Sequence, residues 1–248
     1  MAERLDFSRR PELEEQMDGP CSYEELRGCL RDLAVVNRLT LAHRPTMLWL
    51  KEILSPTSQS RNLGRSDGAA RAVKLVDVGC GYGDLLRKIE RWAGECSVRV
   101  ELVGVDVNAN AVRAAREATP AASRIQWVVG DARACAETQG ADIVTMTTVM
   151  HHLSEEEIVQ MLQWMERETR LGWMVNDLHR MPMPYRLFNV AARGPWWHRF
   201  IRPDGLASIR RSFVEEDWER MCAAAGLGFS EVEIRAHRPA RLVVSRRK

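Results

Sequence analysis

Between residues 73 and 176 the sequence alternates short runs of β-branched and aliphatic residues with amphipathic helical segments. The apolar runs cover residues 73–78, 98–105, 125–129, 141–148 and 172–176, and the helical segments cover 85–92, 109–118 and 154–170. An alternation of strand and helix predicts a parallel sheet with right-handed crossovers and with helices on both faces. The fold class expected for this chain is therefore α/β.

The end of the chain departs from that rhythm. Residues 213–225 form another helical segment, and Gly226 follows it as a C-terminal cap. Two further apolar runs, 229–235 and 241–246, are joined by the short link AHRPA. A link of this length permits only an antiparallel hairpin, because a parallel pair needs about a dozen connecting residues. We expect a mostly parallel sheet of seven strands whose last strand is antiparallel.

Residues 1–71 differ in texture from the rest and are expected to form a helical lid segment and a linker. Ser22 and Glu25 have the spacing of a capping box, which predicts a helix that Pro45 interrupts and that resumes as far as Leu54. Residues 55–71 have the composition of a surface linker. We place the α/β domain at 72–248, with a helical insert at 181–211.

Composition excludes several classes of protein. The 36 basic and 34 acidic residues give a net charge of +2, which argues against a histone-like chain, although 32 of the basic residues are arginine. A GC-rich genome produces the same bias toward arginine. No run of 18 apolar residues predicts a membrane span, and the charged N-terminus does not read as a signal peptide. Six cysteines without a C-x-x-C pair predict reduced thiols in the cytoplasm and no metal site.

A glycine-rich segment follows the first apolar run and begins the next helix, with Gly79, Gly81 and Gly83 at alternate positions. Glycines at such a turn let the backbone approach a ligand closely, and the helix presents free amides to it. Asp106 ends the second run, where a carboxylate can accept both hydroxyl protons of a ribose. A dinucleotide site requires G-x-G-x-x-G, but Asp84 stands at the third glycine position and would repel a pyrophosphate.

The segment Asp77-Val-Gly79-Cys-Gly81-Tyr-Gly83 resembles the first motif, acid-x-G-x-G-x-G, of the seven-stranded class I methyltransferases. The resemblance extends over residues 73–248. It implies an enzyme with a Rossmann-like, doubly wound sheet and S-adenosyl-L-methionine as cofactor. The glycines and Asp77 would then surround the amino acid part, Asp106 the ribose, and Asp131 the adenine. The other residues implied for this site are Cys80, Val107, Asn108, Ala132 and Thr147. Asn108 has the alternative of capping the next helix, and Asp131 that of a polar turn residue.

The reacting end is expected after the fourth strand. The segment His151-His152-Leu153 resembles the "HHL" of small-molecule methyltransferases, including those of ubiquinone and menaquinone biosynthesis. A neutral histidine is a suitable base for a phenol, whose pKa is near 10. His151, His152 and His179 are the candidates, with the alternative that one of the paired histidines only packs or caps a helix. His43, His198 and His237 are expected to be surface or lid residues.

The insert supplies candidates for substrate contact. It is rich in methionine and aromatic residues, and residues 180–211 carry seven arginines but a single acid, Asp204. These features suggest an apolar pocket for a substrate that is anionic or presented by an acidic carrier protein. The alternatives are that the aromatic residues pack the insert and that the arginines form a solvated face. The candidate substrate residues are Asn37, Arg180, Trp196, Trp197 and Arg210.

The arrangement of residues 176–248 is similar to that of methyltransferases encoded beside bacterial polyketide synthases. This resemblance implies O-methylation of a phenol, quinol or acid in natural product biosynthesis. Two alternatives remain: C-methylation of a polyketide or quinone precursor, and a non-catalytic cofactor-binding protein. Nucleic acid is not expected as a substrate, because no N-P-P-Y-type motif follows the fourth strand. The acceptor molecule and the oligomeric state are left open by the sequence.

Overall fold

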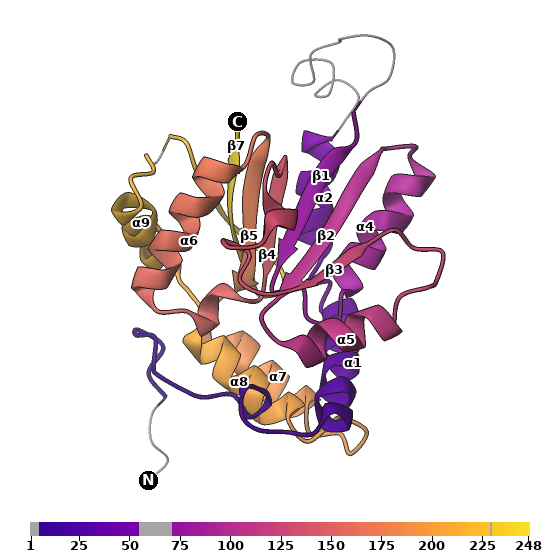
Figure 1. Ribbon diagram of the computed structural model, residues 1–248. Helices are drawn as coiled ribbons and strands as arrows, with labels where there is room; N and C mark the ends of the chain where they lie inside the picture. The colour runs from indigo at the N-terminus through magenta and orange to yellow at the C-terminus, as the bar shows by residue number, and fades with distance from the viewer. Residues whose placement is uncertain (1–4, 55–70, 229) are drawn as a thin grey trace.

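The computed structural model describes residues 5–54, 71–228 and 230–248, which form one seven-stranded sheet in the order β3-β2-β1-β4-β5-β7-β6 (Figure 1). The first five strands run parallel, and β7 is antiparallel to both β5 and β6, as predicted. The strands are β1 (Val73–Val78), β2 (Val100–Asp106), β3 (Gln126–Val129), β4 (Ile143–Thr147), β5 (Gly172–Leu178), β6 (Glu233–His237) and β7 (Arg241–Arg247).

Helices cover both faces of the sheet and its lower edge in Figure 1. One face is covered by α2 (Arg44–Ile53) and α4 (Asp84–Glu95), and the other by α6 (Glu155–Glu168) and α9 (Glu215–Ala224). The lower edge, where β1 to β5 end, carries α1 (Tyr23–Leu39), α5 (Ala109–Glu117), α7 (Pro182–Ala191) and α8 (Ile201–Arg211). Short 3-10 helices lie at Gln16–Asp18, Ala136–Thr138 and Met150–His152. Among the described residues, no helix combines the length and apolar character needed to cross a bilayer.

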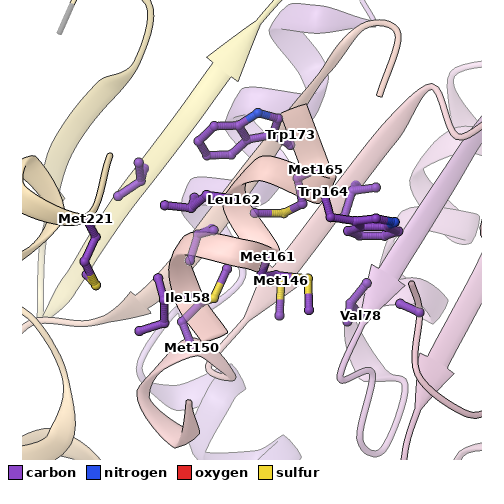
Figure 2. Packing of buried hydrophobic residues seen from close by; sticks show 14 of the residues in the cluster. Val78, Met146, Met150, Ile158, Met161, Leu162, Trp164, Met165, Trp173 and Met221 are labelled. Carbon is purple, nitrogen blue, oxygen red and sulfur yellow. The ribbon is translucent and has the colours of Figure 1, made fainter. Parts of the chain in front are cut away.

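The parallel strands are buried on both faces, which explains their nearly continuous apolar sequence. In β1, Val73 and Leu75 belong to the cluster beneath α2 and α4, while Val76 and Val78 belong to the cluster beneath α6. Figure 2 shows the second cluster, in which side chains of α6 lie against residues of the strands. Because side chains alternate between the two faces of a strand, Asp77 near the end of β1 lies on the same face as Val73 and Leu75, toward α2 and α4.

The N-terminal helices differ from the lid that the sequence predicts. Ser22 and Glu25 form the expected capping box, but α1 ends at Leu39 and Pro45 lies in the first turn of a separate helix, α2. The apolar face of α2 packs on the sheet with Leu50 fully buried, so α2 is part of the core. Of the two N-terminal helices, only α1 lies over the edge of the sheet. The predicted linker, except for Arg71, falls outside the described residues.

A buried carboxylate ties three parts of the chain together. The Asp142 side chain is 1% exposed and accepts hydrogen bonds from Arg71, Arg170 and the backbone amide of Lys74. These contacts connect the start of β1, the start of β4 and the turn that leads into β5. The charge-assisted bonds contribute to stability because the acceptor is withdrawn from water.

We expect Asp142→Asn to lower the free energy of unfolding by about 2 kcal/mol, since the amide places a donor against two guanidinium groups. Urea denaturation measures this change. The exposed residue Glu137 provides a matched control, for which Glu137→Gln should change stability by less than about 0.5 kcal/mol. Equal stabilities for the two variants would show that the Asp142 contacts contribute nothing.

Candidate active site at the carboxyl edge of the sheet

A cavity of about 670 Å³ opens at the edge where the parallel strands end. Its walls come from the residues that follow β1, β2, β3 and β4, and its roof comes from α1 and α8. Ligands of open α/β sheets bind outside the carboxyl ends of the strands, which is the position of this cavity. The glycine loop lines this cavity, and so do His151 and His152.

The glycine loop adopts a conformation that only glycine accepts at two of its positions. Gly79 has φ +68°, and a Cβ atom there would lie 2.4 Å from the Val149 side chain. Gly83 has φ +72°, and its Cβ atom would lie 2.2 Å from the Trp127 ring. The loop therefore packs directly against two other segments while its backbone faces the cavity.

Asp106 is held in place by the backbone. Its two carboxylate oxygens accept hydrogen bonds of 2.9 Å from the amides of Gly81 and Asn108. Burial raises the pKa of Asp106 in spite of these bonds. The Asn108 side chain accepts from the amides of Asn110 and Ala111, so it caps α5, while Val107 beside it is exposed. The proposed ribose contact of Asn108 stays a prediction.

Asp77 and Asp84 form an acidic pair at the loop. Asp77 is buried and accepts a hydrogen bond from Thr145, and burial, with Asp84 and Asp106 nearby, raises its pKa to about 7. Asp84 lies 3.3 Å from the Asn37 amide nitrogen and 3.2 Å from His43 Nε2. His43 is 6% exposed, so it is not a surface residue, and it lines the cavity. Burial lowers the pKa of His43 to about 4, which keeps the imidazole neutral.

The remaining residues implied for the cofactor line the same cavity. Asp131 is bound by the Arg133 guanidinium, which lowers the pKa of the carboxyl, and Ala132 beside it is buried. Cys80 is buried, and burial raises the pKa of its thiol well above the usual value. The Thr147 hydroxyl is buried and has no hydrogen-bond partner among the described residues.

His151, which lines the same cavity, lies between two carboxylates. Its Nδ1 is 2.7 Å from Asp177 Oδ1, and its Nε2 is 3.5 Å from Glu15 Oε1. Burial disfavours the charged imidazolium, but Asp177 and Glu15 outweigh that effect and raise the pKa of His151 to about 9. The imidazole therefore holds a proton at neutral pH in this arrangement, and a ligand that binds Nε2 has to displace that proton.

His152 shares Glu15 with His151. Its Nε2 is 3.8 Å from Glu15 Oε2, and its Nδ1 is 3.0 Å from Asp18 Oδ2. Glu15 precedes the short helix Gln16–Asp18 and accepts a hydrogen bond of 2.8 Å from Ser208 of α8. The insert therefore positions an N-terminal carboxylate over the paired histidines.

Several of the predicted residues do not line the cavity. His179 pairs through its backbone with Ala240 and Phe213, just past the carboxyl end of β5, and its side chain is not part of the lining. Arg180 is 2% exposed and binds the Ser212 carbonyl and the Asp217 carboxylate, so it joins the insert to α9 rather than anchoring a substrate. The other residues absent from the lining are Trp196, which is 74% exposed, Trp197, whose indole donates to the Ala191 carbonyl, and Arg210.

The lining is strongly acidic. It contains one guanidinium, that of Arg133, and eight carboxylates: Glu15, Asp18, Asp77, Asp84, Asp106, Asp131, Glu157 and Asp204. None of the seven arginines counted in residues 180–211 belongs to it. The cavity therefore suits a cationic ligand, and the expectation of an anionic substrate finds no support in its walls.

Four residues of this site escaped the sequence reasoning: Glu15, Asp18, His43 and Asp177. Asp177 had a usable signal, because it follows Val175 by two positions and so shares its buried side of β5. Glu15 had none, since the segment PELEEQMD offers four acids with no periodicity. The backbone just after β4 is also held by a residue that is distant in the sequence. Buried Arg241 donates a hydrogen bond to the hydroxyl of Thr148, whose φ is +59°.

Because the pKa of Asp77 is raised, we expect the free energy of unfolding of the ligand-free protein to depend on pH. Between pH 3.8 and about 7 the folded protein keeps Asp77 protonated while the unfolded chain ionises it, so stability falls as pH rises. Asparagine cannot ionise. We expect the stability of Asp77→Asn relative to the parent to increase through this window and then to level off.

Urea denaturation at about pH 4.5, 6 and 8 measures the relative stability of the Asp77 variant. Glu95→Gln, at an exposed position, is the control and should show no such trend. A difference between Asp77→Asn and the parent that does not change with pH would contradict the prediction.

Comparison with known proteins agrees with this geometry. Residues 75–172 match a family model described as a methyltransferase domain. A trans-aconitate 2-methyltransferase from Azoarcus sp. (strain BH72) is 30% identical over 144 residues, which cover 56% of this chain and 52% of that protein. The chain thus spans about half the length of the curated relative that it matches.

Solved structures show the same architecture over most of the chain. A candidate O-methyltransferase from Nostoc punctiforme PCC 73102 has a TM-score of 0.59 at 16% identity and covers 95% of this chain and 63% of its own. The plantazolicin methyltransferase with S-adenosylhomocysteine has a TM-score of 0.57 at 10% identity, with coverages of 90% and 96%. Magnesium protoporphyrin IX methyltransferase from Synechocystis PCC 6803, also with S-adenosylhomocysteine, has 0.51 at 14% identity and covers 84% of both chains. The chain therefore has the seven-stranded class I methyltransferase fold, and its residues 75–172 match the methyltransferase domain model.

Proposed function

We propose that this protein binds S-adenosyl-L-methionine in the cavity and transfers its methyl group to an oxygen of an apolar small molecule. The observation that carries the proposal is the acidic lining between the glycine loop and the paired histidines. The cofactor is positively charged at its sulfonium and its ammonium, and carboxylates in a partly dry site stabilise such charges. Two of the similar structures named above contain the demethylated cofactor, which supports the same ligand here.

In this proposal the backbone of the glycine loop surrounds the amino acid part of the cofactor, and Asp77 ionises as the ammonium approaches. Asp106, already oriented by two amides, accepts the ribose hydroxyls. Asp131 and Ala132 lie farther along the same wall and would hold the adenine. Cys80, Val107, Asn108 and Thr147 line the space between these points.

The acceptor would lie between the paired histidines and the apolar roof. Leu26, Leu30 and Leu33 of α1 face the cavity, and Ile201 of α8 lies beside them. Transfer forms an oxygen–carbon bond as the carbon–sulfur bond breaks, and the hydroxyl proton of the acceptor passes to water. Since the sulfonium is already a good leaving group, the main task of the protein is to position the two reactants.

The chemistry of the reacting end favours oxygen as the acceptor atom. Glu15, His151 and His152 gather polar groups where a hydroxyl proton has to be released. C-methylation of a polyketide or quinone precursor needs the same cofactor site but also groups that stabilise a carbanion. The relative named above acts on trans-aconitate by its name, an anion that the acidic lining here does not suit.

Calorimetry with S-adenosyl-L-methionine tests the cofactor site. We expect Asp106→Asn to weaken binding by about 30-fold, because a charge-assisted contact contributes about 2 kcal/mol. Glu95→Gln, far from the cavity and exposed, should bind as the parent does. Equal affinity of Asp106→Asn and the parent would refute the assigned ribose contact, and absence of binding by the parent would refute the whole proposal.

A product assay separates the catalytic alternatives. The protein is incubated with cofactor and a panel of phenols, quinols and carboxylic acids, and methylated products are identified by mass spectrometry. We expect neutral apolar phenols and quinols to react in preference to acids, because anions are repelled by the lining. Methylation at carbon would favour the first alternative, and cofactor binding without turnover would favour a non-catalytic cofactor-binding protein.

A further inference from the structure

We infer that Glu15, His151 and His152 form a binding site for one divalent transition-metal ion of the zinc type, with a free coordination position facing the cavity. The site is a property of these three side chains. Its catalytic use, as the point where the acceptor oxygen binds, rests on the proposed function.

The three side chains converge. One ligand atom from each lies within 4.8 Å of the other two, and Glu15 presents one oxygen to each imidazole. His151 Nε2 is 3.5 Å from Oε1, and His152 Nε2 is 3.8 Å from Oε2. Ligands around a tetrahedral zinc ion at about 2.0–2.1 Å are about 3.3 Å apart, so small side-chain adjustments would close the site.

Both imidazoles are oriented as metal ligands usually are. A metal-binding histidine almost always donates its other ring N–H to a carboxylate or carbonyl, which fixes the ring and raises its basicity. Here Asp177 lies 2.7 Å from Nδ1 of His151, and Asp18 lies 3.0 Å from Nδ1 of His152. Each ring therefore has a carboxylate at Nδ1 and directs Nε2 toward Glu15.

One of these nitrogen atoms lacks a hydrogen bond. His151 is 1% exposed, and its Nε2 has no hydrogen-bond partner among the described residues. A buried polar atom without a partner is costly, and a metal ion would satisfy it. Two imidazoles and one carboxylate are also a ligand set of catalytic zinc sites, which keep a further position open.

The carboxylate ligand is itself held at one of its oxygens by two residues of the insert. Ser208 donates to Glu15 Oε1 at 2.8 Å, and the Arg211 guanidinium lies 3.6 Å from the same oxygen. The Asp204 carboxylate accepts hydrogen bonds from the backbone amides of Gln16 and Met17 at 2.8 and 3.0 Å. These bonds anchor the backbone directly after Glu15. The insert thus supplies the outer support for a ligand that comes from the N-terminal segment.

The open position explains how an acceptor would be activated. A hydroxyl oxygen bound there loses its proton to water more readily, because the cation stabilises the oxyanion. The bound oxygen then takes the methyl group as the carbon–sulfur bond breaks. No oxidation or reduction is involved, which agrees with an ion that has no redox chemistry.

Metal titration of the whole chain tests the inference. Wild-type protein, freed of metal by a chelator, is titrated with Zn²⁺ by calorimetry and with Co²⁺ by visible absorption. We expect one equivalent to bind, with the ligand-field absorption of a nitrogen and oxygen site. Glu15→Gln and His152→Gln should each lower the affinity at least about 10-fold. Glu14→Gln, an exposed neighbour, should bind as the wild type does.

The free thiols require a separate control, since Cys96 is exposed and thiolates also bind these ions. The titrations are therefore made on a Cys96→Ser background, and near-ultraviolet thiolate-to-cobalt bands would reveal any remaining cysteine site. Far-UV circular dichroism confirms that each variant is folded, and partly exposed His152 is the substitution least apt to disturb the core.

Two outcomes overturn the inference: no saturable binding by the wild type, or unchanged affinity in both Glu15→Gln and His152→Gln. The cluster would then be an ion-pair latch between the N-terminal segment and the histidines. Calorimetry with S-adenosyl-L-methionine on the same samples separates the two proposals. Cofactor binding without metal binding refutes only the metal site, and metal binding without cofactor binding refutes only the proposed function.

Discussion

The carboxyl ends of β1, β2, β4 and β5 meet at one edge of the sheet, and the candidate site depends on this parallel alignment. Asp77, Asp106 and Asp177 lie at or near the ends of three of these strands, and His151 follows a fourth. The period of two along a strand decides which of them meet. A register shift by one residue would turn Asp177 away from His151 and Asp77 away from Thr145.

Charge is divided between the inside of the cavity and its surroundings. Carboxylates line the cavity, while the arginines of the insert bind acids and carbonyls around it. Arg180 pairs with Asp217, Arg199 with Glu25, and Arg211 lies near Glu15. These arginines thus join segments together, which accounts for their absence from the cavity lining. The net charge of +2 conceals this separation.

The fold and the position of the glycine loop and Asp106 at one cavity were predictable because their signals are local. Each strand or helix period is read within one short segment, and the three alternating glycines and Asp106 lie within about thirty consecutive residues. The reacting end was not. Glu15 reaches Ser208 across 193 residues of sequence, and no local pattern encodes such a contact.

The sequence predicts a catalytic role for His179 and overlooks Asp177 for a specific reason. The sequence places the end of β5 at Asn176, so the next residues read as a loop at the active edge. In the structure β5 continues to Leu178, because pairing with β7 extends to the register of Leu178 with Arg241. Asp177 therefore stays inside the sheet, and His179 lies past its end. Similarly, the sequence predicts that α2 belongs to the lid, because an amphipathic pattern does not indicate which surface the helix covers. In the structure α2 packs on the sheet.

The position of β7 between β5 and β6 has a consequence for how the protein reaches this state. Strands β1 to β5 and their helices involve mostly short separations along the chain and can assemble first. The second partner of β5 is β7, which is far from it along the chain, and Asp177 pairs with Leu242 in that strand. Contacts between distant residues form slowly, because the entropy of closing the loop must be overcome first. The part of the domain that carries the glycine loop is therefore expected to form earlier than the surroundings of His151, which acquire their final geometry when β7 is inserted.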